Sequence, residues 1–163
     1  MRELTADEIR AGFINITTDE AERVPMPGLH EVIWSEREFL GWLDPSLAGR
    51  GYLTLDTDAG VVSIVVRRAD SLGGRAVSAM CSMCHSTQPI SQVSLFSAAR
   101  AGQRGRDGST VGPHICDALP CPHKIRLLPA HSPSGLIPGD LLTGRSRGLL
   151  QRLEGFTTVV AGA

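Results

Sequence analysis

The amino-acid sequence predicts a mixed α+β domain with short N-terminal helices and antiparallel hairpins. Three observations lead to this fold class: helix-start patterns near the N-terminus, two adjacent runs of strand-forming residues, and two pairs of cysteines far apart in the sequence. The chain has 163 residues, of which 42% are hydrophobic, so we expect one domain with its own core rather than a disordered chain.

Helix starts are predicted where a Ser or Thr is followed three residues later by Glu, because the two side chains can satisfy the free N–H groups of a first turn. The pattern occurs at Thr5–Glu8, Thr17–Glu20 and Ser35–Glu38. The third helix would carry Phe39, Leu40 and Leu43 inward and end before Pro45, since the residue before a proline resists helical angles.

Strands are predicted where apolar and β-branched residues run or alternate between turn residues. Residues 51–56 (GYLTLD) and 61–67 (VVSIVVR) flank the turn sequence T-D-A-G and therefore predict a hairpin. A further strand is expected over 92–99, followed by a Gly- and Arg-rich loop and a last strand around 111–115.

The composition changes to Pro, Ser and Gly from about residue 129. We therefore expect residues 1–128 to form one α+β domain and residues 129–163 to form a linker with one more helix over 145–154. The tail is expected to be partly disordered.

Charge and hydropathy limit the partners. Residues 1–30 lack a basic start followed by an apolar run, and no window approaches the roughly 18 apolar residues of a membrane span, so a cytoplasmic protein is expected. Residues 1–66 contain 12 acidic residues and 5 arginines (net -7), whereas residues 67–163 contain 5 acidic residues, 10 arginines and one lysine (net +6). Such a basic half suits either solvation or contact with RNA, a ribosome or an acidic protein.

All four cysteines fall into two close pairs. Cys81 and Cys84 form C-x2-C, Cys116 and Cys121 form C-x4-C, and 31 residues separate the pairs. Zn²⁺ prefers four tetrahedral ligands, and two close pairs on tight turns, brought together by a hairpin, supply them. In a reducing cytoplasm the cysteines are poor candidates for disulfides, so a structural zinc site is the favoured interpretation.

Two other interpretations of the cysteines stay open. A thioredoxin-like redox C-x2-C is disfavoured because it should follow a strand of a parallel sheet, and it leaves the second pair unexplained. Ordinary buried thiols would not need the paired spacing. His85, His114 and His123 each lie within two residues of a cysteine and could replace one as a ligand, although four thiolates already complete a closed site.

Catalysis is not expected, and we assign no catalytic residue. A closed four-cysteine site leaves zinc no open position for water. The H-x-E of zinc deaminases, the G-x-S-x-G of hydrolases and the phosphate-binding G-x4-G-K-[ST] are missing from the sequence. No small-molecule substrate is therefore expected.

The sequence around the cysteines resembles a known family. MCSMCHST, followed by VSLFSAARAGQRGRDGSTVGPHIC and a further cysteine five positions on, is similar to the treble-clef zinc-finger domain of the elongation factor G-binding proteins, the FusB-type fusidic-acid-resistance family. LTADEIRAGFIN, FLGWLDP and GYLTLDTDAGVVSIVVR look like the leading part of the short single-domain bacterial members. The resemblance covers roughly residues 4–126.

This resemblance implies an α+β domain with a treble-clef zinc finger over about 78–126 that binds elongation factor G and promotes its release from the ribosome. It places the zinc ligands at Cys81, Cys84, Cys116 and Cys121. The partner-binding side of the family falls here on Ser82, Met83, His85, Arg104 and Arg106. Pro120 and Pro122 lie where the last ligand helix should be, which predicts that this helix is short or displaced.

The leading functional hypothesis is a zinc-binding adaptor of translation that contacts elongation factor G or the ribosome, with RNA contact left open. The first alternative is a zinc-finger nucleic-acid-binding protein, in which the basic residues of 67–163 (net +6) would contact phosphates. A C-x2-C thiol-redox enzyme is the second, and it would need an exposed cysteine of low pKa.

Overall fold

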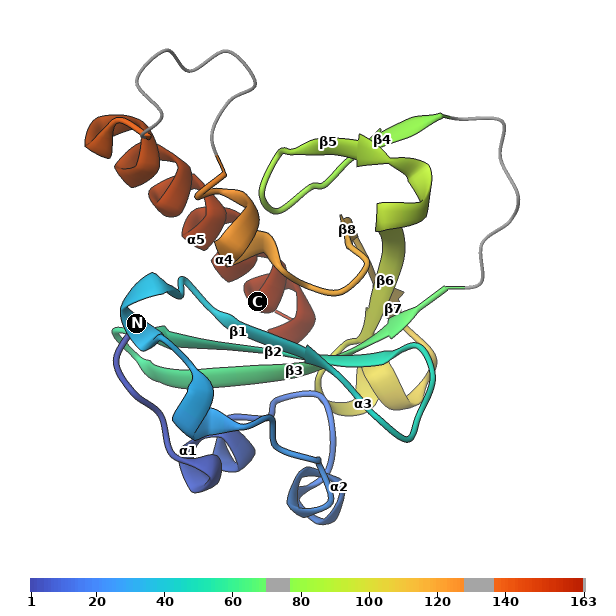
Figure 1. Ribbon diagram of the computed structural model, residues 1–163. Coiled ribbons are helices and arrows are strands. Elements are labelled where there is room, and N and C mark those ends of the chain that lie inside the picture. Colours follow the sequence, from blue (N-terminus) through green and yellow to red (C-terminus); the bar gives the residue numbers. More distant parts are fainter. Residues whose placement is uncertain (70–76, 128–136, 163) are drawn as a thin grey trace.

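The molecule is built on one antiparallel sheet (Figure 1), and the computed structural model describes residues 1–69, 77–127 and 137–162. The strand order is β1-β2-β3-β6-β7, and β8 also pairs with β6. These strands are β1 (Leu40–Leu43), β2 (Arg50–Thr57), β3 (Gly60–Arg68), β6 (Val93–Ala99), β7 (Thr110–Val111) and β8 (His114–Cys116). A separate two-stranded sheet consists of β4 (Ser78–Met80) and β5 (Thr87–Pro89).

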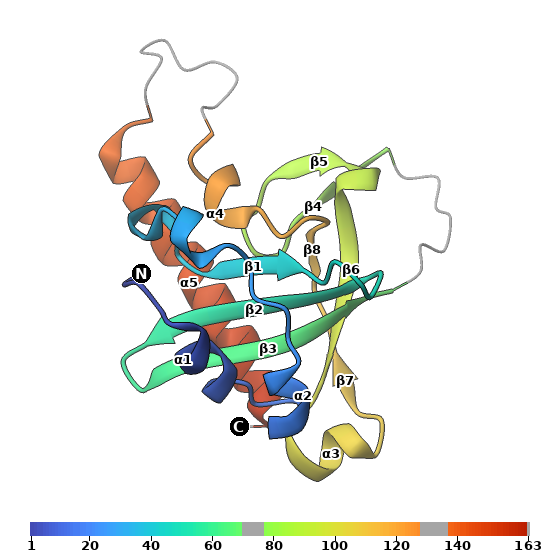
Figure 2. The ribbon, with the colours of Figure 1, turned by 60° about the horizontal axis from the view of Figure 1, so that its bottom comes forward.

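Helices cover both faces of the sheet, as two views of the ribbon show (Figures 1 and 2). The two N-terminal helices lie on one face and the long C-terminal helix lies on the other. The α-helices are α1 (Ala6–Ala11), α2 (Thr18–Glu22), α3 (Gly102–Arg106), α4 (Cys121–Lys124) and α5 (Gly139–Ala161). Short 3-10 helices occur at η1 (Leu29–Glu31), η2 (Trp34–Glu36) and η3 (Ile90–Gln92). None of the helices in the described ranges is long and apolar enough to cross a membrane.

The predicted hairpin is confirmed as β2–β3, and its alternation creates two hydrophobic cores. Tyr52 lies opposite Val65, and both side chains face α1 and α2 in what we call the N-terminal core. The next pair, Leu53 and Ile64, faces the other way into a larger core, the central core. Side chains alternate between faces along a strand, so one hairpin serves both cores.

The first two predicted helix starts are confirmed. Thr5 and Thr17 each accept a hydrogen bond from the N–H of the Glu three residues on, and each Glu accepts one in return. These reciprocal bonds satisfy N–H groups that the helix itself leaves free. They let helices of only six and five residues begin at defined positions.

The third predicted helix is wrong. Residues 34–36 form only a 3-10 turn, and Leu40–Leu43 form the edge strand β1, which pairs antiparallel with β2. The Ser35–Glu38 pattern fails because the Glu38 side chain does not cap a helix; it is 6% exposed and binds Arg126 instead. Phe39 and Leu40 are buried as expected, whereas Leu43 is exposed.

The Gly- and Arg-rich loop and the strand after it differ in detail from the prediction. The loop contains the short helix α3, and the strand expected around 111–115 is divided into β7 and β8. The division falls at Gly112, where a Cβ atom would lie 2.2 Å from the carbonyl oxygen of Phe96. A side chain cannot occupy that space, so the close approach of the two backbones requires glycine.

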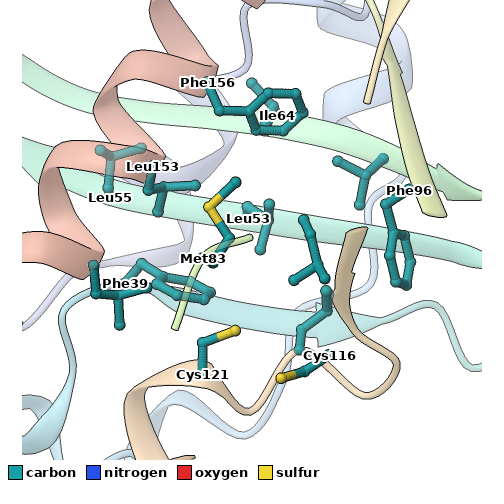
Figure 3. Close-up of a cluster of buried hydrophobic side chains, with 14 of the residues drawn as sticks. Phe39, Leu53, Leu55, Ile64, Met83, Phe96, Cys116, Cys121, Leu153 and Phe156 are labelled. Atoms are coloured by element: carbon teal, nitrogen blue, oxygen red, sulfur yellow. The ribbon is translucent and has the colours of Figure 1, made fainter. Parts of the chain in front are cut away.

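The C-terminal helix is longer than predicted. It runs from Gly139 to Ala161 rather than over 145–154, and it ends at Gly162, whose φ of 89° favours glycine. Leu149, Leu153 and Val160 are fully buried. Figure 3 shows Leu153 and Phe156 of this helix among the side chains of the central core. The helix thus shares the central core, and most of the expected linker, residues 128–136, lies outside the described residues.

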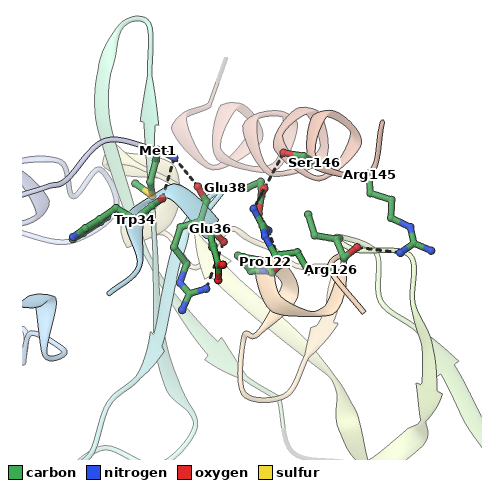
Figure 4. A network of polar contacts seen from close by, with 10 residues as sticks. Met1, Trp34, Glu36, Glu38, Pro122, Arg126, Arg145 and Ser146 are labelled. Atoms are coloured by element: carbon green, nitrogen blue, oxygen red, sulfur yellow. Dashed lines mark hydrogen bonds and ion pairs between the residues drawn. The ribbon is translucent and has the colours of Figure 1, made fainter. Parts of the chain in front are cut away.

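A buried ion pair connects the residues just before β1, the turn after α4, and α5 (Figure 4). Both terminal guanidinium nitrogens of Arg126, Nη1 and Nη2, donate to the carboxylate of Glu38, at 2.8 and 2.9 Å. The hydroxyl of Ser146 on α5 donates to the same carboxylate at 2.8 Å, and Arg126 also donates to the Pro122 carbonyl. We call these residues the Glu38 network; it supplies partners for a carboxylate that burial would otherwise destabilise.

Candidate metal centre

The fold brings the two cysteine pairs together. Cys81 and Cys84 lie in the turn between β4 and β5, Cys116 ends β8, and Cys121 begins α4. Their four sulfur atoms all lie within 4.8 Å of one another. Figure 3 shows Cys116 and Cys121 at the edge of the central core, below Met83. Sequence spacing therefore predicted a real three-dimensional cluster.

The first pair lies on a tight knuckle. The N–H groups of Met83 and Cys84 point at the Cys81 sulfur, at 3.4 and 3.5 Å. The chain then turns back, with the His85 N–H donating to the Cys81 carbonyl and His85 itself at a φ of 56°. This left-handed residue directs Cys84 toward the same point as Cys81.

The second pair combines a strand end and a helix start. Cys116 is the last residue of β8. Leu119, at a φ of 60°, turns the chain so that Cys121 opens α4, which has only four residues. Pro122 is tolerated because it stands in the first turn, where its missing N–H has no helical partner. The prediction of a short helix is confirmed.

The sulfur spacing fits a zinc ion. Cys81 and Cys121 sulfurs are 3.7 Å apart, and those of Cys84 and Cys116 are 3.6 Å apart. A tetrahedron with Zn–S distances of about 2.3 Å has sulfur–sulfur edges of about 3.8 Å. Each of these two distances joins a sulfur of the first cysteine pair to a sulfur of the second pair, so the contacts hold the two halves of the finger together.

Charge among the thiols is unevenly shared. Contacts with Cys116 and then Cys121 lower the pKa of Cys81 to about 7, and the same neighbours lower the pKa of Cys84. The pKa of Cys121 is raised, first by its hydrogen-bond contact with Cys116 and then by that with Cys81. Without a cation the cluster cannot hold four negative charges, and a divalent metal removes this conflict.

Polar groups that the sequence analysis missed surround the cluster. Gln88, 7% exposed on β5, donates to the Cys116 sulfur at 3.0 Å. Arg152 on α5 donates to the Met83 carbonyl, which fixes the knuckle against the helix. Neither residue belongs to a recognisable motif. Only the pairing of β5 with β4 and the docking of α5 bring them to the site.

The histidines do not join the cluster. Among the described residues the cluster consists of the four cysteines, and His85, His114 and His123 all have exposed side chains. A histidine ligand would need a ring nitrogen among the sulfurs. The four-cysteine arrangement thus accounts for the site without one.

The expected partner residues fall into two groups. Ser82, Met83 and His85 lie together on the knuckle, but the Met83 side chain is only 3% exposed and packs into the central core. Arg104 and Arg106 lie on α3, at the opposite end of the molecule from the finger (Figure 2). The structure therefore does not bring the two groups together.

A pocket of about 640 Å³ opens beside the knuckle, between α4 and α5. Cys84, the least buried of the four cysteines, lies in its wall. Three cationic side chains, Lys124, Arg145 and Arg152, also line it, together with the carboxylate of Asp140.

Comparison with known families agrees with this geometry. The family model described as the FBP C-terminal treble-clef zinc-finger matches residues 8–160. Comparisons with curated proteins and with solved structures found no match. The matched range contains both cysteine pairs, the sheet and nearly all of α5. The chain is a structural zinc-binding domain and belongs to the family of FBP C-terminal treble-clef zinc-finger domains.

Proposed function

We propose that this protein is a non-catalytic, cytoplasmic adaptor of translation that binds elongation factor G and promotes its release from the ribosome. In this proposal Cys81, Cys84, Cys116 and Cys121 hold the zinc ion that shapes the finger. Zinc supplies folding free energy rather than reactivity, as in other closed four-cysteine sites.

The observation that carries the proposal is the closed four-sulfur cluster in a chain of the FBP zinc-finger family. Four thiolate ligands fill the tetrahedral positions of zinc, so no position is left at which the metal could activate water. A zinc site of this kind supports a binding role, and the family resemblance supplies the expected partner.

The knuckle offers the partner-facing surface in this proposal. His85 is exposed at its tip, and Ser82 is partly exposed beside it. The neighbouring pocket adds three cations, which favour an acidic stretch of a protein partner. Arg104 and Arg106 would be a second contact for a partner large enough to reach the other end of the molecule, or they serve only solubility.

The experiment measures binding of the zinc-loaded chain to purified elongation factor G by calorimetry. We expect His85→Glu to weaken binding at least roughly tenfold. The new carboxylate would face the acidic stretch of the partner, and like charges that face each other across an interface repel. His30→Glu is the matched control, because His30 is an exposed histidine on η1, outside the knuckle. Zinc content and melting temperature of both variants should match those of the unmodified chain.

Other outcomes distinguish the alternatives. Absence of binding to elongation factor G, free or on a fusidic-acid-stalled ribosome, contradicts the partner assignment. Binding to RNA alone, with affinity that falls steeply with salt, would favour a nucleic-acid-binding protein. Zinc-bound thiolates are not free nucleophiles. Turnover of a disulfide substrate by the zinc-loaded chain would therefore show a reactive cysteine outside the metal site and favour the redox interpretation.

A further inference from the structure

The buried amide of Gln88 bridges the two halves of the sulfur cluster. Its Nε2 atom lies 3.0 Å from the Cys116 sulfur and 2.7 Å from the Ser86 hydroxyl oxygen. The Ser86 oxygen in turn lies 3.0 Å from the Cys84 sulfur. A continuous chain of polar contacts therefore runs from Cys116, on β8, to Cys84, on the knuckle.

The hydrogens of this chain can be assigned by counting donors. An amide nitrogen carries two hydrogens, and here one points to Cys116 and the other to Ser86. In the metal-bound cluster Cys84 is a thiolate without a hydrogen, so the Ser86 hydroxyl, which accepts from the amide, donates its own hydrogen to Cys84. Both sulfurs then accept hydrogen bonds, as metal-bound thiolates do.

The position of Gln88 makes this arrangement rigid. Its residue is 7% exposed, and β5 holds it by pairing Gln88 with Ala79 of β4. A reversed amide would place its carbonyl oxygen against the hydroxyl oxygen and the sulfur, with no hydrogen for Cys116. The orientation with the amide nitrogen toward Ser86 and Cys116 is therefore the one that supplies a donor to both.

We propose that Gln88, acting through Ser86, is a positioning residue that holds the cluster in its metal-binding geometry and slows metal loss through Cys84. This inference rests on the proposed zinc site. Cys84 is the least buried of the four cysteines and lies in the wall of the pocket, so its release from the metal is the expected first step of zinc loss. Hydrogen bonds to ligands from surrounding residues typically change metal affinity 10–100-fold.

The first test compares Gln88→Met with the unmodified chain. Methionine has a similar length but lacks both amide donors, so we expect zinc transfer to a chromogenic chelator to be at least roughly tenfold faster. Ser86→Ala removes only the donor to Cys84, and we expect it to act in the same direction without altering a buried side chain of the strand. Gln103→Met, on exposed α3, is the matched control and should release zinc at the unmodified rate.

A spectroscopic readout separates positioning from general destabilisation. In the Co²⁺-substituted chain, the sulfur-to-cobalt charge-transfer bands should shift in both Gln88→Met and Ser86→Ala. The double variant should release zinc little faster than Gln88→Met alone, because the two residues act in one network. Unchanged bands together with unmodified release rates for both single variants would overturn the inference. Failure of the unmodified chain to bind zinc would instead overturn the proposed function.

Discussion

Single residues set the shape of the knuckle, and His85 is one whose backbone is strained. Its φ of 56° lies in the left-handed region, which costs a residue with a side chain of the order of 1 kcal/mol. The position follows Cys84 directly and completes the turn that orients that sulfur. The sequence places an exposed histidine where glycine would be the least strained residue.

We therefore expect His85→Gly to be more stable than His85→Ala by about 1 kcal/mol in the zinc-loaded chain. Both changes remove the imidazole, so the difference between them reports the backbone conformation at this position, after the greater unfolded-state entropy of glycine is allowed for. Urea unfolding followed by circular dichroism measures it. If the alanine variant were as stable as the glycine variant, the left-handed conformation of His85 would be contradicted.

Tyr52 is the single tyrosine of the chain, which makes its ionisation directly observable. Burial, and then the hydrogen bond that its hydroxyl donates to Asp44, raise the pKa of Tyr52 from 10 to about 12. The neutral phenol is therefore favoured in the folded state. Its contribution to stability is fully present below pH 10 and is lost as the pH rises through about 12.

We expect the tyrosinate absorbance of the folded chain to rise near pH 12, and that of the urea-unfolded chain near pH 10. Asp44→Asn should bring the folded titration closer to the unfolded one, because the carboxylate charge and its hydrogen bond are removed. A folded chain that titrates near pH 10 would show that Tyr52 is not held as described.

Among the elements, α5 and β1 are joined to the finger by the Glu38 network. Glu38 is nearly fully buried, and its charge is balanced by one bidentate arginine and one hydroxyl. Removal of one partner from such a pair leaves the other charge buried without compensation, and this typically lowers the free energy of unfolding by about 3–5 kcal/mol. Replacement of both partners removes the buried charge as well.

Arg126→Met should accordingly lower the free energy of unfolding by about 3 kcal/mol, and the double variant Glu38→Gln/Arg126→Met should recover part of this loss. A double-mutant cycle by urea denaturation tests the coupling. Arg2→Met, which breaks an ion pair between exposed side chains, is the control and should leave stability nearly unchanged. Additive effects of the two substitutions at Glu38 and Arg126 would contradict the network.

The sulfur cluster and the hydrophobic core are one structure at the scale of the whole molecule. Cys81, Cys116 and Cys121 belong to the same buried cluster as Leu53 of β2 and Leu153 of α5. Loss of the metal therefore affects more than the finger. Repulsion among the thiolates would act directly on residues that hold the sheet and the C-terminal helix together.

We expect the purified chain to contain one equivalent of zinc by elemental analysis. Removal of zinc with a chelator should lower the melting temperature of the entire chain in a single transition, since structural zinc supplies of the order of 10 kcal/mol. Differential scanning calorimetry with and without chelator measures this. A chelated chain that melts at the original temperature, or loses only the finger in a separate early transition, would contradict the shared core.

The sequence by itself determined the parts that depend on local chemistry. The Thr–Glu capping pairs at Thr5 and Thr17 fixed two helix starts, and the alternation of residues 51–67 fixed the β2–β3 hairpin. The two cysteine pairs predicted the metal cluster, because ligand spacing within each pair is a local constraint. Pro120 and Pro122 predicted the short ligand helix for the same reason.

Only the tertiary structure decided the elements whose conformation depends on distant partners. Ser35–Glu38 has the local pattern of a helix start, yet the Glu38 carboxylate binds Arg126, which is 88 residues away. The residues that follow Glu38 pair with β2 as a strand. The length of α5 and the role of Gln88 likewise follow from contacts with the sheet and the cluster. A local pattern records which hydrogen bonds a segment can make, whereas burial against the rest of the chain decides which of them it makes.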